Sequence, residues 1–258
     1  SIQPSEFCKI TVILALAQYF QSDFDNRKSF HFFFISILLA SVPMFLIFKQ
    51  PDLGTAMIIF PILFAMLFFV GANRFYLVGS VVLGLVAAPF LWMRLAQYQK
   101  DRLLTFINPN ADPTGSGYTL LQSKVAIGSG GFYGKGWFHG TQTQLGFLPE
   151  KHTDFIFSVL GEEWGFVGSA VVISLYFILL YICMSIASRA GSVYGKVAAV
   201  GISVMLFTHV FINTAMTVGL MPITGLPLPF MSYGGSSLLT SFIAIGLLLN
   251  INGEKYRF

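Results

Sequence analysis

Residues 165–188 read GFVGSAVVISLYFILLYICMSIAS and contain no charged side chain. About 20 apolar residues in a helix, each rising 1.5 Å, cross the hydrocarbon core of a bilayer. This stretch therefore predicts a transmembrane helix. The composition agrees, because 55% of the 258 residues are hydrophobic, 28 are phenylalanine and only 10% are charged. A soluble domain of this length could not cover so much apolar surface.

Six further segments have the same character, which predicts an all-α polytopic membrane protein with about seven spans. With 165–188 they are residues 3–20, 30–48, 54–71, 75–93, 197–220 and 235–250. The first contains Glu6 and Lys9, which stand three positions apart on one helix face and can pair. Pro43, Pro61 and Pro89 fall inside spans, where neighbouring helices can satisfy the freed carbonyls. We expect one transmembrane domain over residues 1–258.

Charge divides the connections between spans into two sets. The short loops of the first set are basic, and the positive-inside rule places them in the cytoplasm. The other set contains most of the acids and is then extracytoplasmic, where no ATP is available and a reaction needs an activated substrate. The basic residues form no stripe suited to nucleic acid. The basic residues of the first set are Arg27, Lys28, Arg74, Arg189, Lys196, Lys255 and Arg257.

Residues 94–164 form one long extracytoplasmic loop, too polar to span a bilayer and too rich in aromatic residues to be a plain linker. We expect short amphipathic helices lying at the interface and joined by glycine turns. The glycine-rich stretch from Gly128 to Gly136 lacks the lysine and hydroxyl spacing of a phosphate-binding loop. Its backbone could instead approach a ligand closely.

The end of this loop collects charged side chains just before the fifth span, and a polar cluster at a membrane edge is a functional hypothesis. We expect Thr153 to cap a helix that starts near Asp154. Asp154 could serve only the electrostatics of that helix start. Alternatively, it is a base whose burial near Phe155 and Phe157 raises its pKa. Spacing alone does not choose among the carboxylates of the cluster, which are Glu150, Asp154, Glu162 and Glu163.

Other polar residues also allow two interpretations. Glu150 and Lys151 could be an exposed ion pair, and Glu162 and Glu163 could belong to the site or to the wet rim of the span. Asp52 lies on the same predicted face and could belong to the site, or it could only begin a capped helix. Residues 221–237, with three prolines and three glycines, predict a re-entrant or cavity-lining loop. His209, inside a span, is interpreted as a packed, hydrogen-bonded core histidine.

Four motifs together closely resemble the SEDS family (shape, elongation, division and sporulation). They are QPSE at 3–6 with Lys9, PDLGT at 51–55, LPEKHTDFIF at 148–157 and PFMSYGGS at 229–236. The stretch KGWFHGTQ at 135–142 is similar to the RodA branch of that family. The resemblance implies a ten-span fold of which this chain is the last seven spans, so we expect an N-terminally truncated chain.

The resemblance also implies a function. It is that of a peptidoglycan glycosyltransferase that polymerises lipid II on the outer face of the bacterial inner membrane during cell elongation and rod-shape maintenance. The implied partner is a class B penicillin-binding protein, a transpeptidase. The family's proposed catalytic aspartate falls on Asp154. The residues expected to bind substrate are Glu6, Lys9, Asp52, Glu150, Lys151, His152 and Ser232.

The expected reaction is an inverting displacement of polyprenyl diphosphate, with a carboxylate as base. Lys9, Lys151 or another cation would stabilise the departing diphosphate. A magnesium or manganese ion held by Glu150 or Asp52 could do the same, although no metal-binding spacing is present, and no other cofactor is expected. The alternative is a lipid II flippase or transporter without catalytic activity. Such proteins keep ionisable groups near the membrane midplane, whereas the acids here collect at one face, which favours an enzyme.

Overall fold

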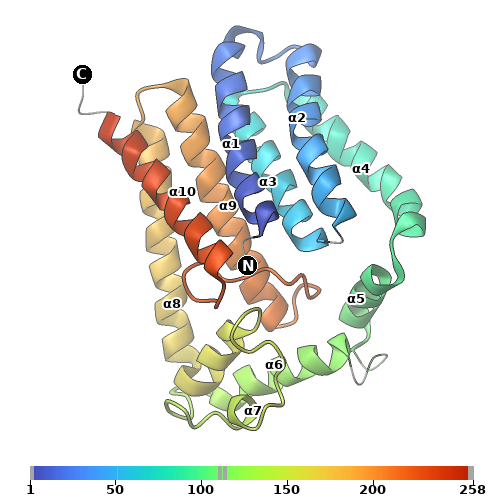
Figure 1. The fold of residues 1–258 in the computed structure, drawn as a ribbon, viewed down its shortest axis with the longest axis vertical. Helices are drawn as coiled ribbons and strands as arrows, with labels where there is room; N and C mark the ends of the chain where they lie inside the picture. Colours follow the sequence, from blue (N-terminus) through green and yellow to red (C-terminus); the bar gives the residue numbers. More distant parts are fainter. Residues whose placement is uncertain (1–2, 51, 110–111, 113–114, 255–258) are drawn as a thin grey trace. The chain divides into compact units, whose positions relative to one another are not determined.

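The computed structural model describes residues 3–50, 52–109, 112 and 115–254, and in this part of the chain every regular element is a helix (Figure 1). The predicted all-α class is confirmed, because one long helix corresponds to each predicted span. The long helices are α1 (Pro4–Ser22), α2 (Phe30–Lys49), α3 (Leu53–Val70), α4 (Arg74–Arg94), α8 (Ile156–Arg189), α9 (Val193–Thr217) and α10 (Gly235–Glu254). The short ones are η1 (Phe24–Asn26), α5 (Gln97–Ile107), α6 (Ser116–Gly130) and α7 (Thr141–Gln144).

Among the described residues, four of the long helices have the length and apolar character of membrane spans. Within the described residues, α2, α8, α9 and α10 are long and apolar enough to cross a bilayer, while α3 and α4 contain shorter apolar helices. Along α2, Phe34, Val42 and Phe45 each expose more than half of their surface. Soluble proteins rarely expose contiguous apolar surface of this kind. The chain is therefore a multi-pass membrane protein.

The chain divides into two compact units. The first comprises residues 1–88, 179–208 and 235–258, and the second comprises residues 89–178 and 209–234. Three helices, α4, α8 and α9, contribute residues to both units. The expectation of a single domain stays a prediction.

In the first unit, α1 packs against α2, α3 and α10. Its buried face includes Phe20, whose ring centroid lies 4.9 Å from that of Phe32 in α2. At Gly201 of α9, a Cβ atom would lie 2.7 Å from Cγ2 of Ile13 and 2.8 Å from Sδ of Met66. Glycine at this position thus lets α9 approach α1 and α3 closely.

In the second unit, α8 is broken at Gly165, which has φ 64° and ψ −157°. The sequence places the start of the span at this residue, whereas the helix already begins at Ile156. A break frees backbone groups that need new partners in an apolar medium. The loop of residues 131–136 supplies them. Phe166 and Val167 N–H donate to the carbonyls of Gly131 (2.9 Å) and Phe132 (3.1 Å), and Lys135 and Gly136 N–H donate to the carbonyls of Glu162 and Glu163 (both 3.0 Å).

Residues 218–234, here named the proline-rich loop, contain no regular helix, so the break predicted over 221–237 is confirmed up to Gly234, whereas α10 already begins at Gly235. Its re-entrant or cavity-lining character stays a prediction. Buried side chains of α8 and α9 lie within hydrogen-bond distance of three of its carbonyl groups, which helps irregular backbone to be tolerated in a membrane protein. His209 is 4% exposed, and its Nδ1 lies 3.2 Å from the Pro227 carbonyl, which confirms the interpretation of a packed core histidine. Tyr176 donates to the Pro229 carbonyl, and Asn213 donates to the Leu226 carbonyl over 2.7 Å.

Candidate functional site

The predicted polar cluster forms a tight turn between α7 and α8, in the second unit. Glu150 has a positive φ of 52°, and its carbonyl accepts the N–H groups of Thr153 (3.2 Å) and Phe155 (3.3 Å). The Thr153 hydroxyl donates to the carbonyl (3.2 Å) and the carboxylate (2.9 Å) of Glu150. The prediction that Thr153 caps a helix near Asp154 is wrong. α8 begins at Ile156, and the Thr153 hydroxyl donates to Glu150 within the turn instead.

Asp154 carries the most perturbed carboxylate of this turn. Burial and, to a smaller extent, the negative charge of Glu150 raise the pKa of Asp154 to about 6, against the opposing positive charge of Arg102. A Cβ atom at Gly225 would lie 3.6 Å from Asp154 Oδ2, so the backbone of the proline-rich loop passes beside the carboxylate. A carboxylate with a pKa near the working pH is suited to general-base chemistry.

The backbone carbonyls of three successive residues, His152, Thr153 and Asp154, each accept a hydrogen bond from another segment of the second unit. These three bonds, here named the carbonyl clamp, hold the Asp154 segment in place. The donors to the first two carbonyls belong to the proline-rich loop, and the donor to the third belongs to α9. Tyr233 N–H donates to His152 O (2.8 Å), the Ser232 hydroxyl donates to Thr153 O, and the Asn213 amide donates to Asp154 O (2.9 Å). The position of the Asp154 backbone is therefore fixed from two sides.

The remaining site residues of this turn differ in their surroundings. Lys151 Nζ donates to the Thr143 carbonyl over 2.6 Å, while Glu150 and the His152 side chain are exposed. The Ser232 hydroxyl donates to the Thr153 carbonyl as part of the carbonyl clamp, and it also accepts the N–H of Leu228 over 2.8 Å. Its hydroxyl hydrogen is thus used within the protein. The predicted substrate-binding roles of these residues stay predictions.

Glu162 is completely buried, so the interpretation that it lies on a wet rim is wrong. A buried carboxylate requires charge and hydrogen-bond partners. Glu162 has them in the Nζ of Lys135 (2.8 Å), the N–H groups of Gln142 (2.9 Å) and Thr143 (3.1 Å), and the Thr143 hydroxyl (2.8 Å). Because the Thr143 carbonyl in turn accepts Lys151, Glu162 fixes the chain that supports that lysine.

The other predicted site residues meet in the first unit. Lys9 Nζ and Glu6 Oε1 form a buried ion pair at 2.8 Å, as the helical spacing predicts. Asp52 caps α3, since its Oδ1 accepts Thr55 N–H over 3.0 Å. Its Oδ2 accepts the side chains of Gln3 (3.2 Å) and Ser5 (3.4 Å). The structure thus brings Glu6, Lys9 and Asp52 together in one unit, and Glu150 to Asp154 with Ser232 in the other.

A metal ion would need a set of converging ligands. Among the residues that the structure describes, no group of three or more His, Cys, Asp and Glu side chains could hold one. Glu150 and Asp52 are each engaged with hydroxyl, amide or N–H donors of the protein. The predicted magnesium or manganese ion stays a prediction, and no step below is assigned to it.

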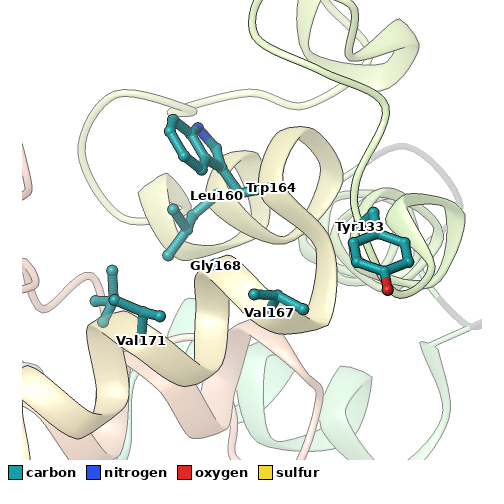
Figure 2. A pocket seen from close by; sticks show the side chains of 7 residues that line it. Tyr133, Leu160, Trp164, Val167, Gly168 and Val171 are labelled. Carbon is teal, nitrogen blue, oxygen red and sulfur yellow. The ribbon is translucent and has the colours of Figure 1, made fainter.

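An apolar cavity of about 380 Å³ lies in the bend of α8 (Figure 2). Figure 2 shows Leu160 and Trp164 on one side of the break and Val167 and Val171 on the other. Tyr133 closes a further side. Since its lining carries no carboxylate, this cavity offers hydrocarbon surface rather than a place for acid–base chemistry.

The long apolar helices define a class, the polytopic membrane proteins, and the largely buried carboxylate before one of them is a candidate catalytic group. Comparison with known proteins identifies the family. The FtsW/RodA/SpoVE model, described as cell cycle protein, matches residues 1–257. Peptidoglycan glycosyltransferase MrdB of Escherichia coli K12 is 43% identical over 254 residues, which are 98% of this chain and 68% of MrdB.

Two solved structures of related proteins are similar to this chain in fold and sequence. A chain from a structure described as the coordination of polymerization and crosslinking by a peptidoglycan synthase complex has a TM-score of 0.85 and 32% identity, covering 100% of this chain and 71% of that one. The rod shape determining protein RodA of Thermus thermophilus has a TM-score of 0.67 and 30% identity, covering 100% and 67%. The chain belongs to the FtsW/RodA/SpoVE family, which is the SEDS family that its motifs indicate, and it is a membrane glycosyltransferase.

Two residues near Asp154 were not singled out from the sequence. Arg102 is exposed on α5, and its charge acts on Asp154. Nothing local in the sequence distinguishes it from the other basic residues of the long loop. Asn213 did carry a signal, because an amide inside an otherwise apolar span needs hydrogen-bond partners.

Proposed function

We propose that this chain polymerises lipid II into the glycan strands of peptidoglycan. The observation that carries the proposal is the environment of Asp154. Its carboxylate is largely buried and has a pKa of about 6. Its backbone carbonyl is held by a hydrogen bond from Asn213, just before a membrane-spanning helix. The name of the Escherichia coli relative, peptidoglycan glycosyltransferase MrdB, supports the substrate class.

In the proposed step, Asp154 accepts the proton of the 4-hydroxyl group of one sugar while that oxygen attacks the anomeric carbon of another. The new carbon–oxygen bond forms as the bond from the anomeric carbon to the diphosphate oxygen breaks, which inverts the configuration. The diphosphate departs with its electron pair and needs no proton. One carboxylate is therefore enough, unlike in glycoside hydrolases that use two.

Negative charge grows on the departing diphosphate, and a nearby cation stabilises it. In the second unit, Arg102 and Lys151 are the cations that we assign to this task. Arg102 is exposed and acts electrostatically on Asp154, and Lys151 follows Glu150 in the same turn. Lys9 is buried against Glu6 at 2.8 Å, so a role as a diphosphate ligand requires it to leave that carboxylate.

We propose further that the enzyme serves cell elongation, with a class B penicillin-binding protein as its transpeptidase partner. The description of the Thermus thermophilus relative as rod shape determining supports the first point. The structure that joins polymerization and crosslinking supports the second. The basic short loops support a site on the outer face of the bacterial inner membrane.

The decisive test is polymerisation of labelled lipid II by the full-length protein with its transpeptidase partner, resolved as glycan ladders on gels. Wild type and the matched control Asp25→Asn, an exposed loop carboxylate, should both give ladders. Asp154→Asn keeps the size of the side chain but cannot accept the proton, so its rate should fall by about 10²-fold or more.

Asp154→Asn protein that is folded and polymerises at the wild-type rate would move the base to another carboxylate. Wild-type protein that makes no ladders but carries lipid II across vesicle bilayers would contradict the enzyme and favour the flippase.

A further inference from the structure

We infer that Asn213 is a positioning residue for Asp154. The inference rests on the proposed function, because it concerns the placement of the proposed base. Asn213 lies in the last turns of α9 and is completely buried. Asp154 is 59 positions away in the sequence, so only the folded chain brings the two together.

The amide of Asn213 joins two separate segments. Its Nδ2 donates to the carbonyl of Asp154 over 2.9 Å and to the carbonyl of Leu226 over 2.7 Å. A side-chain amide has two hydrogens, so both are used. The first bond completes the carbonyl clamp at the residue that bears the base. The second holds the proline-rich loop one residue after Gly225.

Gly225 makes the second bond relevant to the chemistry. A Cβ atom at Gly225 would lie 3.6 Å from Oδ2 of Asp154, and its φ of +75° suits glycine. The loop backbone held by Asn213 therefore forms part of the wall beside the carboxylate. Since burial is the first cause of the raised pKa of Asp154, this wall also keeps the carboxylate from water.

The amide also stabilises the fold, because its two bonds satisfy the backbone carbonyls of Asp154 and Leu226. Oδ1 of Asn213 is buried and accepts no hydrogen bond from any residue of the described ranges. A buried acceptor without a partner carries a desolvation cost. An apolar side chain of similar size would avoid that cost but could hold neither carbonyl.

The loss of both bonds should affect the rate more than substrate binding. A misplacement of about 1 Å at a reacting group can cost about 10²-fold in rate. We therefore expect Asn213→Ala to lower kcat by about 10- to 100-fold, with KM for lipid II nearly unchanged. Water that reaches Asp154 should also move the acid limb of the pH–rate profile to lower pH.

The experiment uses the full-length protein with its transpeptidase partner and labelled lipid II. Asn213→Ala and Asn213→Leu both remove the two donors, and leucine keeps a side chain of similar length without adding a charge beside Asp154. Thr214→Ala is the matched control, because in the described part of the chain the neighbouring Thr214 hydroxyl donates to carbonyls of its own helix and to no other group. For each variant, kcat, KM and the acid limb are measured with the thermal unfolding midpoint and the hydrogen exchange of peptides covering residues 150–157.

The inference is supported if both Asn213 variants fold but have a lower kcat, an acid limb at lower pH and faster amide hydrogen exchange over residues 150–157. Thr214→Ala should match wild type in folding, kcat, acid limb and exchange. The inference is overturned if folded Asn213 variants keep the wild-type kcat and acid limb. It is also overturned if their lost activity equals their lost folded fraction and the acid limb stays in place. Inactive wild type contradicts the proposed function itself, and the inference falls with it.

Discussion

At the scale of single residues, the raised pKa of Asp154 predicts how the rate depends on pH. Burial, with a smaller contribution from Glu150, raises this pKa to about 6, so the carboxylate becomes protonated as the pH falls through that value and can no longer accept a proton. At one pH unit below the pKa, about a tenth of the base is ionised, and kcat should be about a tenth of its plateau. Initial rates at saturating lipid II across the acid range check this.

Glu150→Gln gives an internal comparison for that profile. It removes a negative charge that raises the pKa of Asp154, so its acid limb should lie at lower pH than that of wild type. A wild-type rate that stays at its plateau down to pH values near 4 would contradict a buried base, because an exposed aspartate titrates there.

The same residue shows what the sequence can and cannot predict about the site. The neighbours Phe155 and Phe157 are both buried, and they allow the rise in the pKa of Asp154 to be predicted from local sequence. The bonds that Ser232 and Asn213 make to Thr153 and Asp154 join residues 79 and 59 positions apart. No local spacing encodes such contacts, so Ser232 was predicted as a substrate ligand although its hydroxyl bonds the clamp.

At the scale of the elements, the contact between the 131–136 loop and the break in α8 predicts a position that accepts only glycine. Gly134 has φ +81°, and a Cβ there would lie 2.1 Å from the carbonyl oxygen of Glu163. Gly134→Ala should therefore destabilise the protein by about 2 kcal/mol or more, from backbone strain and this clash. Thermal unfolding in detergent measures the effect.

Gly146→Ala is the matched control for this prediction. Gly146 has a similar φ of +74°, but no atom lies within 4 Å of its Cβ position. It should show only the cost of the left-handed backbone. Equal unfolding midpoints for the two variants would mean that the loop does not pack against α8 as described.

The elements themselves were largely predictable, because hydropathy is a local property. The exception is the start of α8, where the polar residues Glu162 and Glu163 end the apolar pattern at Gly165. The helix nevertheless extends back to Ile156. It can do so since Lys135 and the 141–143 segment satisfy the Glu162 carboxylate. Partners from elsewhere in the chain thus override the local pattern.

At the scale of the whole molecule, the charge distribution predicts which loops face the cytoplasm. Gln144 in α7 and Asp25 in η1 are both exposed, and they belong to connections between spans that are predicted to lie on opposite sides of the membrane. In spheroplasts, Gln144→Cys should react with a membrane-impermeant maleimide and Asp25→Cys should not, with Cys8 and Cys183 replaced by serine in both. Both cysteines should react once the membrane is opened with detergent. The reverse pattern in intact spheroplasts would place Asp154 on the cytoplasmic side.

The carbonyl clamp and the break at Gly165 together restrict the number of residues between them. The chain is held at residues 152–154 by the clamp and at Gly165 by the 131–136 loop. One inserted or deleted residue would turn the helix between these points by about 100° and shift it by about 1.5 Å. Glu162 could then no longer meet Lys135 while Asp154 stays in place. The stretch from Phe155 to Trp164 should therefore tolerate changes of side chain far better than changes of length.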